Sequence, residues 1–266
     1  MNKLLSAHHL LASALVILAI SRPVAAVPIA DTYIGADDHN YGDVIGSNSN
    51  FQTYGMDASI TGNVLSVSIN TTFAGKGDNG LFSGYTNTTA GQSKGIGYGD
   101  LFLSSSWTPF GSSSDGYLSD DSTNGTVWTY GFSLDDRWMN ESTAGTGTLY
   151  SLNSGDNSAD TLLSNDFMSG ATYRNNQEVA VNTNGDVSAI TSGDWDIDVV
   201  NQLVTFEIDL TGTSLISGSE IGLHWGFTCA NDVIEGSFVN TVPEPGILLL
   251  MATGLIGLTV TKRKRA

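Results

Sequence analysis

The chain has 266 residues, one cysteine and a formal net charge of −17. Residues 27–241 alone carry −22, since 26 of the 27 acidic residues but only four of the ten Lys and Arg residues lie there. A charge of this sign repels phosphate backbones and argues against a nucleic-acid partner. The single cysteine, Cys229, excludes an intrachain disulfide, and we interpret it as a small buried residue.

The first 26 residues have the pattern of a secretory signal peptide. Lys3 precedes an apolar run at residues 10–20, and small side chains follow at residues 24–26. The run is too short to cross a bilayer, and the small residues are typical of a signal-peptidase site. We expect an N-terminal signal helix, cleavage after Ala26 and a mature chain that begins at Val27.

The body, residues 27–241, shows the two-residue period of half-buried strands. Apolar and polar residues alternate in four segments: 64–70, 127–134, 204–210 and 221–227. Residues 195–199 are expected to form a hairpin with 204–210. Gly- and Asn-rich turns separate these segments, and no stretch has a helical period. The pattern predicts a single all-β domain, an antiparallel β-sandwich of jelly-roll type.

Several aspartates of the body are candidate ligands for Ca²⁺, which prefers six to eight oxygen ligands in flexible loops. They lie in glycine-flanked segments that strand–loop junctions would bring together: Asp37, Asp38, Asp43, Asp100 and Asp232. The competing interpretation is that they are solvated turn carboxylates. No EF-hand spacing is present, and no cofactor other than calcium is indicated.

Two tryptophans are candidates for contact with carbohydrate. Trp107 and Trp138 lie among polar residues, where an exposed ring can stack on a sugar. Trp128 and Trp225 lie on alternating apolar faces and are expected in the core. His224 is expected to be structural. Paired carboxylates also serve glycoside hydrolysis, but none accompanies a substrate-binding motif, so we do not expect an enzyme.

The last 25 residues contain three different pieces in order. An extended proline-rich segment comes first, then 16 mostly apolar residues at 246–261, then a basic cluster at 262–265. The apolar helix would be about 24 Å long, shorter than the ~30 Å core of a bilayer but able to insert with local thinning. The basic cluster should stop transfer and stay cytoplasmic. The proline-rich residues are Val242, Pro243, Glu244 and Pro245, and the basic residues are Lys262, Arg263, Lys264 and Arg265.

This tail resembles the PEP-CTERM sorting signal of Gram-negative bacteria. The resemblance implies recognition by an exosortase in the membrane, which would cleave at residues 242–245 and release or attach the protein. The body segments 34–46, 95–103 and 224–236 resemble a group of exosortase-dependent surface proteins, a likeness that implies a location rather than a reaction.

The sequence therefore predicts three parts: a signal peptide (1–26), an acidic β-domain (27–241) and a sorting tail with a transmembrane helix (242–266). The expected partners are the secretion machinery, the inner membrane, an exosortase and either exopolysaccharide or divalent cations. The expected location is the cell surface or extracellular matrix, and the expected role is non-catalytic. The alternatives are a secreted carbohydrate-binding protein or carbohydrate-active enzyme with the same tail, or a simple single-pass anchored protein.

Overall fold

The computed structural model describes residues 25–36, 40–77, 86–87, 95–159, 161–163, 168–169, 174, 176–215 and 220–239. All of them belong to one compact unit, Val24–Thr241. Apart from residues 25 and 26, the predicted signal peptide and sorting tail lie outside the described residues. No helix in the described part of the chain has the length and apolar character that crossing a membrane requires.

The described residues form an all-β structure in which ten strands belong to one sheet. These strands are β1 (Val27–Ala30), β2 (Thr53–Thr61), β3 (Val64–Thr71), β5 (Leu101–Ser104), β6 (Tyr130–Leu134), β7 (Thr143–Leu152), β11 (Val187–Asp198), β12 (Leu203–Asp209), β13 (Glu220–Gly226) and β14 (Val233–Val239). Their order is β1-β2-β3-β12-β11-β7-β6-β5-β13-β14, and every pairing between neighbours is antiparallel.

The remaining elements are short. Strand β8 (Leu162–Leu163) pairs with β10 (Ala180–Val181), and β4 (Thr86–Asn87) pairs with β9 (Met168–Ser169). Among the described residues the helices are α1 (Asn48–Phe51) and the 3₁₀ turn η1 (Ser113–Asp115).

The alternating segments become strands close to the predicted places. Strands β3, β12 and β13 match three predicted segments to within one residue, and β11 pairs with β12 from Asp198 and Leu203 onward as the expected hairpin. In β12, Val204, Phe206 and Ile208 are buried, whereas Glu207 between them is exposed. Strand β6 starts at Tyr130, three residues later than predicted.

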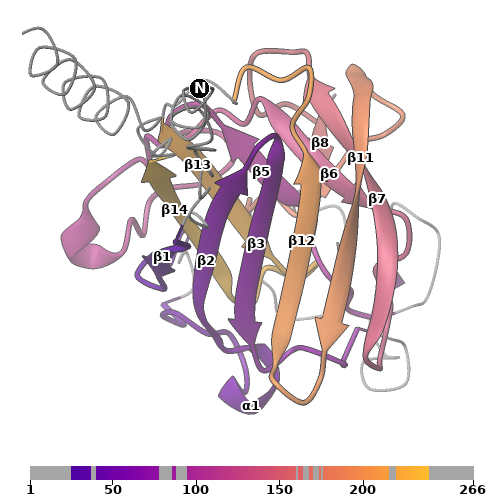
Figure 1. Ribbon diagram of the computed structural model, residues 1–266. Coiled ribbons are helices and arrows are strands. Elements are labelled where there is room, and N and C mark those ends of the chain that lie inside the picture. The colour runs from indigo at the N-terminus through magenta and orange to yellow at the C-terminus, as the bar shows by residue number, and fades with distance from the viewer. Residues whose placement is uncertain are drawn as a thin grey trace, which may run out of the picture. The chain divides into compact units, whose positions relative to one another are not determined.

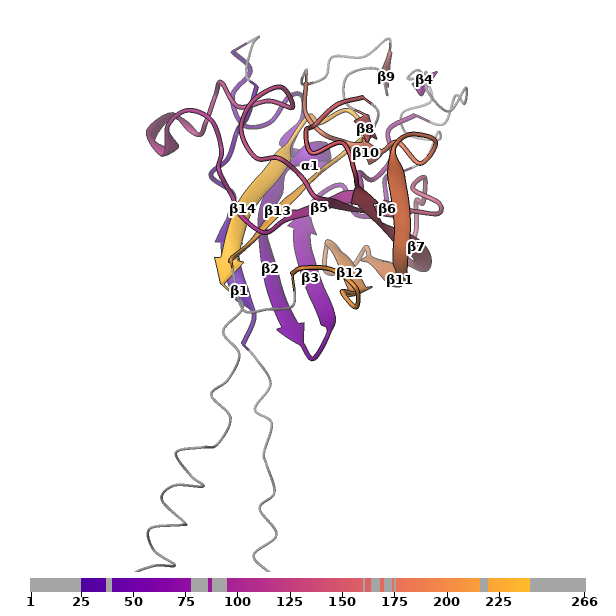
Figure 2. The ribbon, with the colours of Figure 1, turned by 90° about the horizontal axis from the view of Figure 1, so that it is seen from above.

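The sheet curls until its two edge strands, β1 and β14, contact each other (Figures 1 and 2). Gly236 in β14 permits this approach, because a Cβ there would lie 2.5 Å from Cγ2 of Ile29 in β1. Inside the curl, Trp195 and Phe206 from one half of the sheet share one apolar core with Trp225 from the other half. The all-β antiparallel prediction is therefore confirmed. The jelly-roll prediction is not, because the ten strands form one continuous, nearly closed sheet.

Candidate functional site

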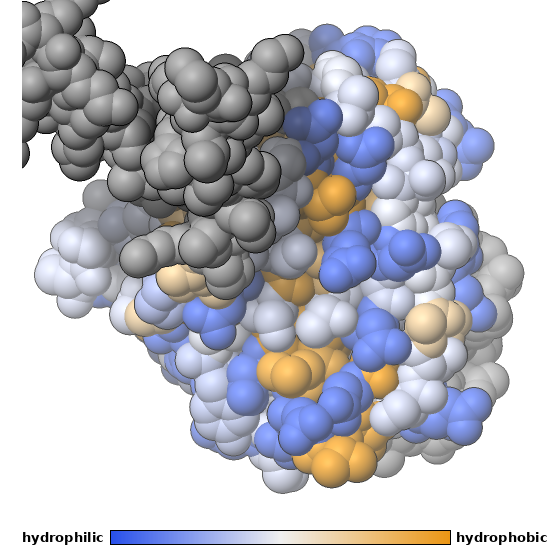
Figure 3. Space-filling model, in the orientation of Figure 1, coloured by the Kyte–Doolittle hydropathy of each residue, from blue (hydrophilic) through white to orange (hydrophobic). Residues whose placement is uncertain are grey.

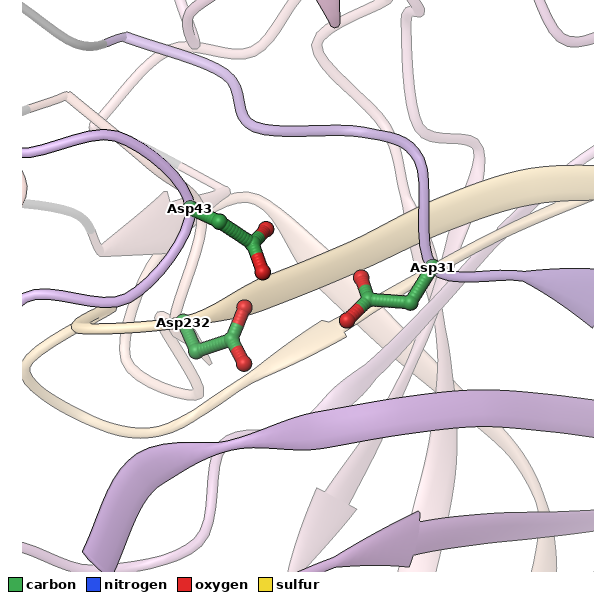
Figure 4. A group of neighbouring side chains, drawn as sticks. All are labelled: Asp31, Asp43 and Asp232. Carbon is green, nitrogen blue, oxygen red and sulfur yellow. The ribbon is translucent and has the colours of Figure 1, made fainter. Parts of the chain in front are cut away.

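Three aspartates from distant parts of the chain come together at one end of the edge strands. Asp31 directly follows β1, Asp43 lies in the loop before α1, and Asp232 directly precedes β14. One carboxylate oxygen of each lies within 4.8 Å of the others. Figure 4 shows the three carboxylates pointing toward one another. No other group of three acidic, His or Cys side chains in the described residues meets this spacing.

Hydrogen bonds from neighbouring strands and loops position the aspartates. The backbone N–H of Thr53, at the start of β2, donates to Oδ2 of Asp232 at 2.6 Å. Nε2 of Gln52 lies 3.4 Å from Oδ2 of Asp43, a long and weak hydrogen bond. The loop that carries Asp43 is pinned to the β13–β14 turn, because the N–H of Ile45 donates to the carbonyl of Asn231 at 2.7 Å.

A buried arginine holds the main chain around this cluster. The guanidinium of Arg174 donates to the carbonyl oxygens of Gly42 at 2.8 Å and Asp43 at 2.7 Å. It also donates to the carbonyls of Ala230 at 3.2 Å and Gly35 at 3.3 Å. Arg174 therefore links the loop after β1 to the turn before β14. Burial raises the pKa values of Asp43 and Asp232, and the positive charge of Arg174 offsets only part of that rise.

Burial makes the three negative charges costly. Asp232 is fully buried, and its pKa is raised to about 9 by burial and then by the charge of Asp31. Burial and the charge of Asp43 raise the pKa of Asp31 to about 8, and burial also raises the pKa of Asp43. Three carboxylates that share so small a space cannot all be ionised near neutral pH without a positive ion among them. The arrangement is suited to holding either protons or a hard cation.

The structure brings together some of the predicted calcium ligands but not others. Asp43 and Asp232 meet, whereas Asp37 and Asp38 lie outside the described residues. The prediction missed Asp31. A signal for it exists in the sequence, because Asp31 is the first polar residue after the apolar Val27–Ala30 segment, at a strand–loop junction.

Asp100 does not join the cluster, which corrects the prediction for this residue. Its carboxylate is fully buried and pairs with Nη2 of Arg137 at 2.9 Å. Its Oδ1 also accepts the N–H of Leu134 at 2.9 Å, and its Oδ2 accepts the N–H of Val181 at 2.7 Å. Both oxygens of Asp100 are therefore occupied by donors of the protein, and the residue has a structural role.

The two candidate tryptophans also lie in the protein rather than on an open platform. Trp107 is half-buried; its Nε1 donates to Oε1 of Glu235 at 2.7 Å, and its ring packs edge-on against Tyr117. Trp138 is half-buried and packs against the small apolar cluster that contains Tyr33 and Val179. Stacking of a sugar on either ring is therefore not favoured by the structure. Trp128 and Trp225 are in the core, as predicted.

A second concentration of titratable groups in the described part of the chain is a buried network of acids around His224. Nδ1 of His224 lies 3.0 Å from Oε2 of Glu235, and its Nε2 lies 2.8 Å from the carbonyl of Glu178. Burial raises the pKa of Glu178 to about 8 and that of Asp120 to about 7. Both ring nitrogens of His224 therefore have partners inside the protein, and Cys229 is buried, as its sequence interpretation predicted.

Comparison with known proteins identifies the tail alone. Residues 241–265 match the family model of the PEP-CTERM protein-sorting motif, which confirms the recognition of this segment from its sequence. No curated protein and no solved structure matches the chain significantly.

Proposed function

We propose that this chain is an exported, non-catalytic surface or matrix protein that an exosortase sorts and cleaves at residues 242–245. The PEP-CTERM motif at residues 241–265 is the observation that carries this proposal. The proposal includes export across the inner membrane of a Gram-negative cell and a final location at the cell surface or in the extracellular matrix.

The boundaries of the sheet support processing at both ends of the body. The expected signal-peptidase cut after Ala26 falls directly before β1, which starts at Val27. The sorting motif starts at residue 241, two residues after β14 ends at Val239. Both cuts would therefore leave every strand of the sheet intact, so that processing changes the location of the body and not its fold.

The titratable groups inside the body support a non-catalytic role. His224, Glu178 and Glu235 are each at most 3% exposed, and the ring nitrogens of His224 are hydrogen-bonded within the protein. A general acid or base must reach the proton that it transfers. This network can reach no substrate without a rearrangement of the core.

Polysaccharide binding is a second candidate function, because an open groove crosses the outer face of β2, β3, β12 and β11. The groove has a volume of ≈ 490 Å³, and polar side chains reach it from all four strands: Asp57, Ser68, Asp194, Asp196, Thr205 and Glu207. Figure 3 views this side of the molecule, where blue and white polar residues surround smaller apolar patches. Carboxylates and hydroxyls in a groove of this size are suited to the hydroxyl groups of a glycan.

The intact mass of the protein from its host, with and without the exosortase gene, tests the sorting proposal. We expect a mature chain that starts at Val27 and ends between Val242 and Pro245, and only when the exosortase is present. A variant with alanine at both Pro243 and Pro245 should keep its tail in the same cells. A mass that retains residues 262–265 in both strains would overturn the proposal and leave a single-pass anchored protein.

Affinity electrophoresis through gels that contain the host's exopolysaccharide tests the second candidate. Retardation of the wild-type protein that is lost in Asp196→Arg, which places a large side chain in the groove, would support glycan binding. The matched control is Asp135→Arg, the same charge change at an exposed residue outside the groove. The candidate would be rejected if each of the three proteins migrated in the polysaccharide gel as it does in a gel without polysaccharide.

A further inference from the structure

We infer that Asp31, Asp43 and Asp232 bind one divalent cation, for which Ca²⁺ is the best fit, and that the ion clamps the first strand of the sheet to the last. This inference goes beyond sorting, and it does not depend on whether the tail is cleaved.

The spacing of the oxygens fits a calcium ion. Three atoms within 4.8 Å of one another all lie within about 2.8 Å of a common point, close to the 2.3–2.6 Å of Ca²⁺–oxygen bonds. Small rotations of the side chains would close the difference. Mg²⁺ requires about 2.0–2.1 Å and near-octahedral geometry, which two loop residues and one turn residue do not readily provide. The group contains no His or Cys, so it does not favour zinc or copper.

Buried oxygens without a hydrogen-bond partner point independently to a missing ion. Asp232 is 0% exposed, yet its Oδ1 has no partner, and neither does the buried Oδ1 of Asp31. A buried polar group without a hydrogen-bond partner lowers the stability of the fold, so such atoms are rare in native proteins. Solvated turn carboxylates, the competing interpretation, would be in contact with water instead.

Two further atoms of this kind belong to immediate neighbours of Asp232. They are Oγ1 of Thr53, whose N–H donates to Asp232, and Oδ1 of Asn231, the preceding residue. Four of the seven buried side-chain atoms without a partner among the described residues therefore belong to Asp31, Asp232 and these two neighbours of Asp232. Oxygen atoms are the ligands that Ca²⁺ selects, and it needs more of them than three carboxylates supply.

A cation would also relieve the repulsion among the acids. Burial and mutual repulsion raise the pKa values of Asp31 and Asp232, so without an ion the cluster retains protons near neutral pH. A divalent ion in the centre would replace those protons and favour the ionised carboxylates. Arg174 is bound to main-chain carbonyls around the cluster, where it shapes the loops.

The position of the cluster gives the ion a mechanical role. Strands β1 and β14 are the two ends of the strand order and share no ladder of hydrogen bonds within the described sheet. Asp31 directly follows β1, and Asp232 directly precedes β14. An ion held by both aspartates would cross-link the edges at the point where the sheet is not closed by its own hydrogen bonds.

Calorimetric titration of CaCl₂ into the full chain in detergent, after removal of metal with EDTA, tests the inference. We expect one ion per chain with a Kd of about 10⁻⁴–10⁻³ M, the range of extracellular calcium modules. Ca²⁺ at about ten times the Kd should raise Tm by about 4 °C. Asp232→Asn and Asp43→Asn should each weaken binding at least tenfold, and the exposed Asp194→Asn, with the same charge change, should leave it unchanged.

A second readout separates a metal ligand from a merely structural aspartate. In EDTA, Asp232→Asn should melt no lower than the wild type, because the amide keeps an acceptor for Thr53 and is neutral, like the protonated acid that the metal-free cluster holds near neutral pH. A variant that melts lower in EDTA and still binds Ca²⁺ like the wild type would overturn the inference. So would a wild-type protein without a bound ion, or an equal loss of binding in Asp194→Asn, which would indicate diffuse attraction to the acidic surface. Asp43→Asn provides the same test at a partly exposed position if Asp232→Asn does not fold.

Discussion

Replacing Asp100 by asparagine is expected to destabilise the protein strongly, and by the same amount with and without calcium. The two carboxylate oxygens accept N–H groups from Leu134 and Val181, and Oδ1 also pairs with Arg137. Asparagine has one acceptor oxygen, so its NH₂ group would face one of the two backbone N–H donors. It would also leave the guanidinium of Arg137, a side chain that is 7% exposed, without the charge of its partner.

The size of the effect follows from these two losses. Removing one member of a buried ion pair costs about 3–5 kcal/mol, and a buried donor without an acceptor costs about 1–3 kcal/mol. The two costs overlap because they share one side chain, so we expect a total of about 4 kcal/mol. For a domain of roughly 200 residues this corresponds to a Tm that is about 8–16 °C lower.

Thermal unfolding followed by circular dichroism, in EDTA and again in CaCl₂, is the appropriate assay for the full chain in detergent. The exposed Asp194→Asn serves as control and should stay within about 0.5 kcal/mol of the wild type. Two results would refute the reasoning. A decrease in Tm of less than about 2 °C would mean that the buried pair contributes little to stability. A decrease seen only in CaCl₂ would identify Asp100 as a calcium ligand after all.

Three other groups allow sharp tests. Burial raises the pKa of Cys229 to about 12, so a thiol reagent at pH 8 should label it only in denaturant, and rapid labelling of the folded protein would contradict its burial. The pKa of Glu178 is raised above its unfolded value to about 8, so its contribution to stability is present in mild acid and lost as the pH rises through 8. Tm should therefore fall between pH 6 and 9. The fall should be less steep in Glu178→Gln but should not vanish, since Asp120 still titrates in the same direction. Gly125→Ala should be less stable than Gly155→Ala by at least about 2 kcal/mol, because both glycines have positive φ but only a Cβ at residue 125 would clash with Oδ1 of Asp120. Equal melting temperatures of the two variants would show that this carboxylate moves aside freely.

The strands were predictable because their signal is local. Alternation of apolar and polar residues fixes which side of a strand is buried, and β3, β12 and β13 follow it closely. The strand order is not local. Pairing of β3 with β12, more than a hundred residues later, depends on how the whole apolar surface is best covered. Sequence periodicity therefore predicted the class of fold, whereas the single curled sheet emerged only from the complete set of pairings.

The candidate site was predictable in kind but not in membership. Asp43, Asp100 and Asp232 are alike in the sequence, since each is an aspartate at the end of a strand or in a turn. What separates them is the neighbour supplied by the fold: Arg137 reaches Asp100, whereas Asp31 reaches Asp232. Whether a buried carboxylate meets a cation of the protein or other carboxylates is a long-range property that no short motif encodes.

Two of the few positive side chains of the body, which has a net charge of −22, are not available to compensate its surface acids. Of the four Lys and Arg residues in 27–241, Arg137 and Arg174 are buried and bound to groups inside the protein. The outer face accordingly places acids together, and Asp194 lies directly opposite Glu207 across β11 and β12. Like charges in such cross-strand pairs are destabilising.

Dissolved ions must therefore compensate part of the negative charge that the protein's own basic side chains leave uncompensated. Screening of exposed acids requires no specific site, so NaCl alone should raise Tm of the metal-free protein. Binding at the three-aspartate cluster is different, because Asp232 is buried and less exposed to screening. The further increase in Tm from Ca²⁺ should therefore persist in high NaCl for the wild type and disappear in Asp232→Asn. If NaCl removed that increase from the wild type as well, the calcium effect would belong to the acidic surface and not to a built site.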